Sequence, residues 1–315
     1  MTDKERYREL CAKETSIPVY SRDWWLDCVC GENKWDVLLY RNKEAIEAAF
    51  PFYNPCKGII SMPLYTQTMG IWFNPLFEDE HYSQNIFRKQ TICEDFIMRL
   101  PKHKYFIQNF PYSFTDWLPF YWNGFRQTTR YTYVLPDIGN PEELWNGLSG
   151  NISQNIQKAK NKYQLTVKRN IPTDVFMKIN AKTYQRQGIK PYYPEMLEKL
   201  INLSRSRNQG DIWGAYDKEN NLHAAVFAVW QKSCAYCLAS GYDDAFRKSK
   251  GHVLTMWTAI NDLSGQVRSF DFEGSMIRGI ENISRGYGGQ QMPYFVIEKG
   301  KMDLLNKIRL KIKYL

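Results

Sequence analysis

Residues 223–242 read HAAVFAVWQKSCAYCLASGY and decide how the second half of the chain folds. Two runs, 223–230 and 234–242, are rich in apolar residues and free of proline, which is typical of β-strands. Residues 231–233 alone separate them, a spacing typical of a hairpin loop. The stretch therefore predicts an antiparallel β-hairpin.

Helices and strands are predicted on both sides of this hairpin in a regular order. Alternation of apolar and polar residues indicates strands, whereas apolar residues three to four positions apart indicate helices. In chain order the segments are strand 165–168, helices 174–187 and 194–205, strand 211–216, the hairpin, helix 251–263, strand 267–272, helix 275–285 and strand 293–297. The second half is therefore predicted as an α/β domain with a mixed sheet.

Two domains are expected, because 315 residues exceed what one hydrophobic core usually organises. One helix start is predicted at Pro141, whose fixed φ suits a first helical turn, and another near Ser149. We therefore expect an N-terminal domain at 1–148 and a C-terminal domain at 149–300. A basic amphipathic helix is predicted at 301–315.

The first half carries a weaker version of the same order. Residues 35–40 and 43–52 predict a hairpin-like pair, 81–100 a helix and 105–108 a strand. An internal duplication is therefore a reasonable hypothesis, although the two halves show no visible repeat of sequence.

Composition restricts the classes of function. Lys and Arg outnumber Asp and Glu by 42 to 33, and the net charge of +9 favours polyanionic partners such as RNA, a nucleotide cofactor or an anionic lipid surface. No apolar run reaches the roughly 18 residues that a transmembrane helix needs, so no transmembrane segment is expected. Hydrophobic residues make up 43% of the chain, which predicts folding along nearly its whole length. We expect a cytoplasmic protein.

The cysteines and histidines give no sign of a metal site. Seven cysteines are an odd number, which argues against a disulfide framework and for reduced thiols. Cys234 and Cys237 form a CxxC pattern, but strand residues three apart face opposite sides of a sheet. The four histidines form no zinc signature. We therefore expect no metal.

Two short segments carry a family resemblance. Residues 270–275 read FDFEGS and 285–289 read RGYGG, which resembles the signature of the Fem family of GNAT-like acyltransferases. Residues 152–160 are similar to the helix that opens that family's second domain. The resemblance implies two tandem GNAT-like domains, with helix 301–315 packed back on the first. The long coiled-coil arm of some members is missing, because 194–205 is short.

The resemblance also implies a function. Members of this group build peptidoglycan bridges from aminoacyl-tRNA, and close relatives are described as acetyltransferases that use acyl-CoA. The chain is then expected to be a transferase, either an N-acetyltransferase or an aminoacyltransferase of cell wall biogenesis. Its acceptor would be an amine of a small molecule, a cell-envelope precursor, a sugar or a peptide. tRNA is a second candidate partner, and helix 301–315 would allow weak association with an anionic membrane surface. The alternative is a noncatalytic RNA-binding or scaffold protein that keeps the fold.

A donor site is predicted where the hairpin leads into the next helix. The segment KSKGHV, 248–253, is similar to the GNAT pyrophosphate loop Q/R-x-x-G-x-G/A, except that it ends in Val. A helix that starts near a glycine presents unpaired N–H groups and a positive dipole end to a phosphate. The predicted donor-binding residues are Arg247, Lys248, Lys250, Gly251 and His252. An ordinary solvated strand-to-helix turn would look similar.

Catalysis is assigned to Glu273 and Asp271. At the end of the strand predicted at 267–272, Asp271 and Glu273 alternate with two Phe residues, so both carboxylates would lie on one face and the Phe rings on the other. Repulsion between the carboxylates would raise the pKa of one of them, which suits a general base. In GNAT-like folds a backbone N–H of the fourth strand, here within 238–242, polarises the carbonyl. Alternatively, Asp271 caps the next helix or pairs with Arg278 or Arg285.

Three residues are predicted to contact the acceptor. Tyr242 ends the hairpin and is a candidate groove aromatic, although a core position explains it equally well. Ser275 ends the signature segment. Arg285 begins a basic, glycine-rich turn that is suited to a phosphate or to the acceptor end of a tRNA, and Gly286 would serve equally as a helix C-cap.

Overall fold

The computed structural model describes residues 1–43, 45–78, 81–186, 188, 193–274 and 276–302. These residues form two compact units. Unit 1 comprises Met1–Arg130 and the segment from Pro293, and unit 2 comprises Tyr131–Met292. The helix expected at 301–315 falls almost entirely outside the described residues.

The boundary between the units differs from the one expected at residues 148 and 149. It lies between Arg130 and Tyr131, within strand β6 (Arg126–Leu135). The second half of β6 pairs with a strand of unit 2, Leu135 opposite Phe270, and Tyr133 and Leu135 belong to the core of that unit. The chain therefore enters unit 2 before the predicted boundary.

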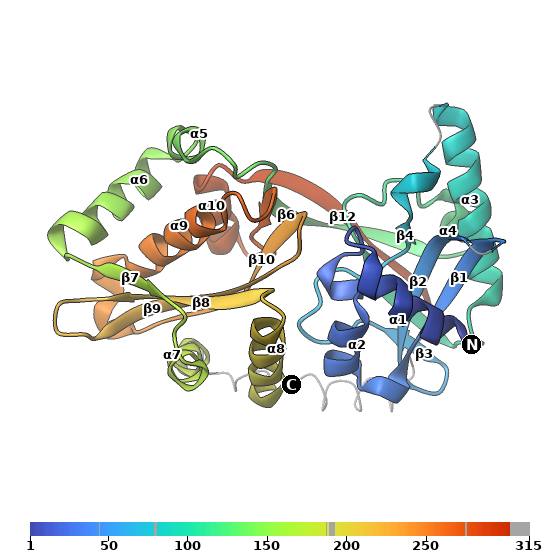
Figure 1. Cartoon of the computed structure of the whole chain (residues 1–315), viewed down its shortest axis with the longest axis horizontal. Coiled ribbons are helices and arrows are strands. Elements are labelled where there is room, and N and C mark those ends of the chain that lie inside the picture. The colour runs from blue at the N-terminus through green and yellow to red at the C-terminus, as the bar shows by residue number, and fades with distance from the viewer. Residues whose placement is uncertain (44, 79–80, 187, 189–192, 275, 303–315) are drawn as a thin grey trace. The chain divides into compact units, whose positions relative to one another are not determined.

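Unit 2 contains the predicted order of helices and strands as far as helix 275–285 (Figure 1). The strand predicted at 293–297 as the last of the C-terminal domain lies in unit 1 instead. After β6 come α5 (Pro141–Asn146), α6 (Gly150–Gln157), a π-helical turn (Lys158–Lys162), β7 (Thr166–Arg169), α7 (Thr173–Arg186), α8 (Pro194–Ser206), β8 (Gly210–Tyr216), β9 (Leu222–Trp230), β10 (Cys234–Tyr242), a 3-10 helix (Asp244–Ser249), α9 (Gly251–Leu263), β11 (Ser269–Asp271) and α10 (Arg278–Gly286). The predicted hairpin is confirmed as β9 and β10, which pair antiparallel.

The sheet of unit 2 has the strand order β7, β8, β9, β10, β11, β6. Its pairs are antiparallel except β10 with β11, which run parallel. Helix α9 lies on one face of the sheet, and α7 and α8 lie on the other (Figure 1). Because both faces are covered, β9 is buried along nearly its whole length, which explains its continuous apolar sequence.

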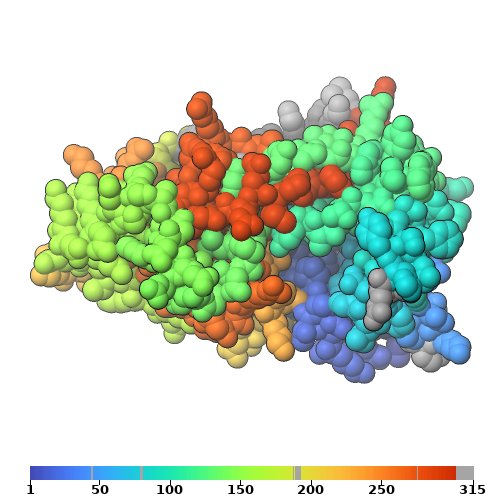
Figure 2. Space-filling model, turned by 90° about the horizontal axis from the view of Figure 1, so that it is seen from above, coloured from blue at the N-terminus to red at the C-terminus, as the bar shows by residue number. Residues whose placement is uncertain are grey.

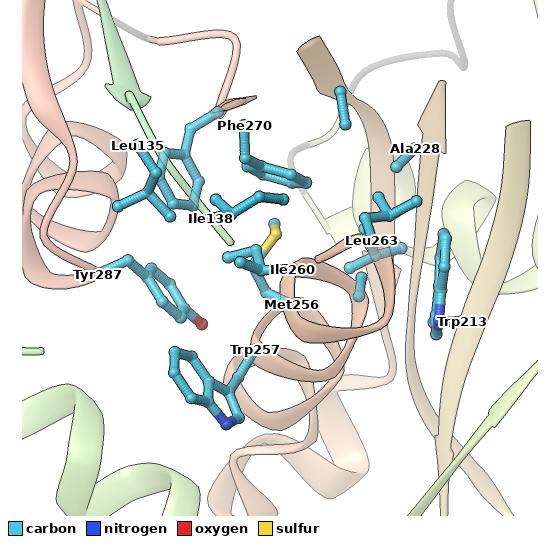
Figure 3. Packing of buried hydrophobic residues seen from close by; sticks show 14 of the residues in the cluster. Leu135, Ile138, Trp213, Ala228, Met256, Trp257, Ile260, Leu263, Phe270 and Tyr287 are labelled. Atoms are coloured by element: carbon cyan, nitrogen blue, oxygen red, sulfur yellow. The ribbon is translucent and has the colours of Figure 1, made fainter. Parts of the chain in front are cut away.

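The main core of unit 2 lies between α9 and the sheet. Met256, Ile260 and Leu263 of α9 are buried together with Trp213 of β8 and Phe270 of β11 (Figure 3). Trp213 also donates from Nε1 to Asp262 Oδ2 over 2.7 Å, so its polar atom is satisfied at the edge of the core.

Unit 1 repeats the central part of this arrangement. Its elements are α1 (Asp3–Lys13), α2 (Asp23–Cys30), β1 (Trp35–Asn42), β2 (Ala45–Cys56), β3 (Ile59–Ser61), β4 (Trp72–Phe73), α3 (Tyr82–Arg99), β5 (Tyr105–Phe110), α4 (Leu118–Trp122) and β12 (Gln290–Gly300), joined by short 3-10 turns. The pairs β1 with β2 and β2 with β3 are antiparallel, β3 and β5 are parallel, and β12 lies antiparallel to β5. The predicted hairpin, helix and strand of the first half are confirmed.

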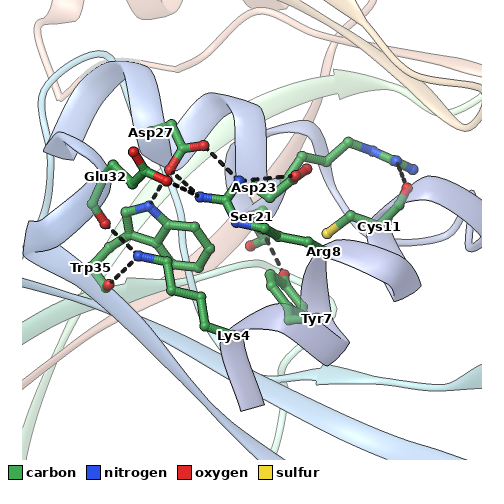
Figure 4. Close-up of polar contacts among 10 residues, drawn as sticks. Lys4, Tyr7, Arg8, Cys11, Ser21, Asp23, Asp27, Glu32 and Trp35 are labelled. Carbon is green, nitrogen blue, oxygen red and sulfur yellow. Dashed lines mark hydrogen bonds and ion pairs between the residues drawn. The ribbon is translucent and has the colours of Figure 1, made fainter. Parts of the chain in front are cut away.

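A polar network ties the first two helices of unit 1 to the start of β1 (Figure 4). Arg8 of α1 donates to Asp27 of α2 at 2.7 and 2.9 Å, and Trp35 Nε1 donates to the same carboxylate at 2.8 Å. Lys4 Nζ lies 4.0 Å from the centroid of the Trp35 ring. The network joins α1, α2 and the start of β1, so these side chains stabilise the fold of unit 1.

Among the described residues, no helix is both long and apolar enough to cross a membrane.

Candidate active site

The predicted donor loop forms a tight turn into α9. The chain leaves β10, makes the 3-10 helix Asp244–Ser249, passes through Lys250 at φ 63° and enters α9 at Gly251. A Cβ on Gly251 would lie 3.0 Å from the Cβ of His223, so the turn packs closely against β9 and leaves little room for a side chain. The expected helix start is therefore confirmed.

The entrance to α9 combines one amide that has no partner among the described residues with cationic side chains that form no described ion pair. The Gly251 amide donates to Ser249 Oγ over a long 3.3 Å, and the His252 amide has no partner within the described chain. Arg247 and Lys248 are exposed, and neither they nor Lys250 forms an ion pair with a described residue. Unpaired amides at the positive end of a helix dipole, surrounded by cationic side chains, suit a phosphate.

His252 contributes no positive charge at neutral pH. Burial of its ring lowers the pKa to about 4, so the imidazole is neutral in the folded protein. The ring meets Tyr242 edge-on, with 6.2 Å between the ring centroids. The guanidinium of Arg186 lies 4.1 Å from the centroid of the Tyr242 ring. The structure thus brings together two of the predicted site residues and adds Arg186 from α7.

A buried hydrogen-bonded chain that the sequence did not reveal supports this turn. His223 Nε2 lies 3.0 Å from Asp217 Oδ2, and His223 Nδ1 lies 2.9 Å from Ser249 Oγ. The imidazole is stacked on Phe246 with 4.0 Å between ring centroids. Ser249 is 2% exposed, so its hydroxyl is out of reach of a substrate. These hydrogen-bonded side chains therefore hold the turn in position and do not form a nucleophilic triad.

The C-terminal part of β10, just before this turn, is paired with a neighbouring strand on one side only. β11 pairs with β10 only from Cys234 to Tyr236, and β11 ends at Asp271. A bulge at Leu238 interrupts the pairing of β10 with β9 on its other side. Residues 238–242 therefore have no strand partner on the β11 side within the described chain. This is the segment in which an N–H was expected to polarise the carbonyl.

Asp271 is buried, and Glu273 is half-buried with its Oε1 atom out of contact with solvent. Asp271 is fully buried, and its Oδ1 accepts the Thr132 hydroxyl at 2.5 Å and the Glu273 amide at 2.7 Å. Asp271 Oδ2 and Glu273 Oε1 have no partner among the described residues. Burial raises the pKa of Asp271 to about 7 and that of Glu273 well above its usual value. The cause is burial, and not the like-charge repulsion that we expected.

Glu273 does not lie on the strand, so the expectation of a shared strand face is wrong. β11 ends at Asp271, Glu273 adopts φ 58°, and Gly274 follows at φ 25°. A Cβ on Gly274 would lie 2.3 Å from the Cα of Thr132, so only glycine fits against β6. A left-handed glutamate is a strained conformation of a kind that occurs at functional sites.

The turn that follows β11 and carries Asp271 and Glu273, here called the carboxyl turn (residues 271–274), is connected to α9 by side-chain contacts. The Phe272 ring stacks on Tyr287, with 5.4 Å between centroids, and the Tyr287 hydroxyl donates to the Val253 carbonyl at 2.9 Å. Tyr287 is buried, and Val253 lies in the first turn of α9. The donor loop and the carboxyl turn are therefore parts of one packed assembly within unit 2.

Arg285 lies apart from the other predicted site residues. It is exposed on α10, where its Nε donates to Glu281 at 2.9 Å. Asp271 does not cap the next helix, because the N-cap of α10 is Ile277. It forms no ion pair with Arg278 or Arg285 among the described contacts, and its Oδ2 atom has no described partner. Gly286 is the last residue of α10 and packs against Ile152, but the C-cap is Tyr287, so the interpretation of Gly286 as the C-cap is wrong. Ser275 lies outside the described residues.

Two further features bear on cofactors and ligands. Among the described residues, no group of three or more His, Cys, Asp or Glu side chains is arranged to hold a metal ion.

Unit 1 has a cavity of about 210 Å³ lined by aromatic and hydroxyl side chains, among them Trp72, Phe114, Thr68 and Ser113. Its lining includes none of the predicted site residues.

Comparison with known proteins finds one matching domain model and several similar folds. Residues 149–282 match the acetyltransferase (GNAT) domain family. FemX is similar over 94% of this chain and 96% of its own, with a TM-score of 0.69 and 10% identity. The C-terminal domain of a putative lysylphosphatidylglycerol synthetase from Agrobacterium fabrum is similar over 98% of both chains, with a TM-score of 0.57 and 10% identity.

A third solved structure, L-PGS from Bacillus licheniformis, covers 85% of this chain and 86% of its own, with a TM-score of 0.50 and 10% identity. No curated protein sequence matches the chain. Residues 149–282 thus match a GNAT acetyltransferase domain model, and the chain as a whole has an α/β fold similar to that of FemX, with the two tandem GNAT-like units that the sequence predicted and no long coiled-coil arm among the described residues.

Proposed function

We propose that the chain transfers an acyl group from a phosphate-bearing donor to an amine. The observation that carries this proposal is the entrance to α9. Within the part of the chain that the structure describes, one amide and three cationic side chains there have no partner, and residues 238–242 of β10 nearby have no strand partner on the β11 side. Phosphates of acyl-CoA or of an aminoacyl-tRNA would bind at the entrance. The acyl carbonyl would then accept a hydrogen bond from a backbone N–H within 238–242.

Glu273 is the group we assign to take the proton from the amine. The amine nitrogen attacks the acyl carbon, the bond from that carbon to the thiol sulfur or ribose oxygen of the donor breaks, and the leaving group takes up a proton. An alkylammonium acceptor that reached Glu273 Oε1, which has no partner among the described residues, would form an ion pair with the carboxylate in a desolvated site. Because burial penalises both charges, transfer of the proton to Glu273 is favoured and leaves a nucleophilic amine.

Asp271 is assigned a positioning role. Its Oδ1 holds the Glu273 amide and the Thr132 hydroxyl, which keeps the left-handed turn in place. We expect the acceptor to be the amine of a small molecule or a cell-envelope precursor, and the reaction to take place in the cytoplasm. Tyr242 and Arg186 beside the open edge of β10 are suited to contact it.

The test is thermal stability of the whole chain with acetyl-CoA, longer acyl-CoAs, charged tRNA and uncharged tRNA, since a ligand that binds the folded state raises Tm. Lys248→Ala should lower the affinity for the donor that gives a shift. Lys232→Ala, at an exposed lysine outside the loop, is the matched control and should not. Glu273→Gln should keep the shift and lose transfer.

Each donor that raises Tm would identify a different function. A shift with acyl-CoA identifies an acyl-CoA N-acyltransferase, and a shift only with charged tRNA identifies an aminoacyltransferase. No shift with any donor, together with salt-sensitive binding of unrelated RNA, would overturn the proposal in favour of a noncatalytic RNA-binding protein.

A further inference from the structure

The backbone groups at the end of β10 alternate between its two sides. In an antiparallel pair, one residue directs its N–H and C=O groups toward the partner strand, and the next residue directs them away. Gly241 lies opposite Ala225 of β9, and two residues later the Asp243 amide donates to the His223 carbonyl at 3.0 Å. Gly241 therefore directs its backbone groups at β9, whereas those of Ser240 point to the side that has no strand partner within the described chain.

Asn180 of α7 takes the place of a neighbouring strand at this position. Its Nδ2 atom donates to the Ser240 carbonyl over 2.8 Å, and the residue is 4% exposed. The α7 backbone lies directly on β10 here, because a Cβ on Gly241 would be 2.6 Å from the Ile179 carbonyl oxygen. Only glycine permits that approach. A side chain at 241 would therefore move Asn180 away from Ser240.

Asn180 reaches β10 from the face of the sheet that α7 covers. Figure 2 shows unit 2 from the opposite face, where α5 and α6, in green, and α10, in orange-red, form the surface. Further along α7, Lys182 forms an ion pair with Asp243, and the Arg186 guanidinium lies over the Tyr242 ring. Helix α7 therefore holds the end of β10 through contacts along two of its turns.

The Ser240 N–H lies between the two parts of the candidate site. No described residue accepts a hydrogen bond from it. It follows by four residues Tyr236, which pairs with Asp271 where β11 ends and the carboxyl turn begins. In the other direction, β10 leads to the donor loop. A donor with its phosphates at the entrance to α9 and its acyl group at Glu273 would extend along this part of β10.

We propose that Asn180 is a positioning residue for acyl transfer, an inference that rests on the function proposed above. Because the N–H and C=O groups of Ser240 belong to one extended residue, a fixed carbonyl also fixes the direction of the N–H. That N–H would donate to the acyl oxygen as negative charge develops there. The Asn180 amide suits this task, since it donates a hydrogen bond without placing a charge in a buried position.

The first experiment needs no donor. Amide hydrogen exchange of the full chain, followed by NMR, should show the Ser240 N–H exchanging on the order of a hundredfold faster than the Gly241 N–H. Asn180→Leu removes the amide at similar volume and should raise the exchange rate of Gly241 at least about tenfold. The matched control is Asn261→Leu, which removes an amide that donates to the Trp257 carbonyl within α9 and should leave Gly241 unchanged.

The second experiment observes the donor carbonyl. The probe is acetyl-CoA, or charged tRNA if that is the donor that raises Tm, labelled with ¹³C at the acyl carbonyl. Binding to the unchanged chain should move the ¹³C resonance downfield, because a hydrogen bond polarises the carbonyl. Asn180→Leu should bind the donor with nearly the same Kd and return the resonance close to its position in the free donor. Ser240→Pro, which removes the N–H on a side without a strand partner, should do the same.

Three outcomes would overturn the proposal. Equal protection of the Ser240 and Gly241 amides in the unchanged chain would mean that the Ser240 N–H is not available. An unchanged resonance in Asn180→Leu would make Asn180 a purely structural residue, and loss of donor binding in that variant would assign it to binding. If neither donor binds the unchanged chain, the proposed function fails and the positioning role fails with it. The exchange experiment then still decides whether Asn180 holds β10.

Discussion

At the scale of single residues, Asp271 and Glu273 show how burial changes what a carboxyl group does. Asp271 keeps two hydrogen bonds to Oδ1, whereas the Oε1 atom of Glu273 has no partner among the described residues. Hydrogen bonds to the charged form lower a pKa and burial raises it. The hydrogen bonds to Asp271 therefore oppose the effect of burial, which raises its pKa to about 7, whereas burial alone raises the pKa of Glu273 well above its usual value.

Asp271 makes the stability of the fold dependent on pH. Its pKa is about 7 when folded and 3.8 as an ordinary aspartate, so the folded state holds the proton more tightly. Stability is then fully present below pH of about 4 and is lost as the pH rises to about 7. Asp271→Asn should therefore unfold at higher urea than the unchanged chain at pH of about 8, by up to roughly 4 kcal/mol, and should lose this advantage at pH of about 4.

Urea unfolding of both proteins at several pH values measures this difference. Asp244→Asn, at an exposed aspartate of the donor loop, is the control for removal of one negative charge. A stability difference between Asp271→Asn and the unchanged chain that stays constant across this pH range would contradict the assignment.

At the scale of elements, sequence reasoning succeeded where burial made the pattern continuous. β10 and α9 begin and end where they were predicted, because both lie in the core and their apolar residues recur with the period of the element. The strand predicted at 267–272 is shorter, since the turn at Glu273 is imposed by packing of Gly274 on β6. That contact joins residues far apart in sequence, so no local pattern announces it.

The hydrogen bonds that connect Asp217, His223 and Ser249 could not be predicted from the sequence for the same reason. Its members lie in the β8 to β9 turn, in β9 and before α9, and a single histidine in an apolar strand is more often a core residue than a functional one. The sequence indicated the donor loop itself, through its glycine and its basic residues. The groups that hold the loop in shape became visible only with the fold.

Ser249→Ala should separate the shape of the donor loop from its charge. The change removes the acceptor of the Gly251 amide and the partner of His223 Nδ1, which should cost about 1 to 3 kcal/mol of stability. It should also weaken donor binding several-fold while the transfer rate at saturating donor stays nearly unchanged. Thr258→Ala, which removes a hydroxyl from the middle of α9, is the control for general loss of stability. Equal donor affinity in both variants would show that the turn does not need this support.

At the scale of the whole molecule, the two units share one pairing pattern. In each, three antiparallel strands are followed by a helix and a strand parallel to the third, as β1, β2, β3, α3 and β5 in unit 1 and β8, β9, β10, α9 and β11 in unit 2. Two helices precede each set. The hypothesis of an internal duplication gains a topological basis that the two sequences do not show.

The last strand of each unit comes from the other half of the chain. β6 follows unit 1 in sequence and pairs through Val134 and Leu135 with β11, whereas β12 follows α10 and pairs with β5 of unit 1. A fragment that starts at 149, the boundary expected from sequence, would leave the edge of β11 unpaired and would remove Tyr133, Leu135 and Leu144 from the core. Exposed edges and missing core side chains both destabilise.

Fragment 131–292 should therefore unfold cooperatively in urea, and fragment 149–292 should not. Both contain the whole GNAT-type domain match, so the comparison isolates β6 and the segment up to α6. The measurement is the near-ultraviolet circular dichroism of the buried Trp and Tyr side chains during the titration. A cooperative transition of the shorter fragment at the same urea concentration would mean that β6 contributes little to unit 2. The chain would then divide where the sequence suggested.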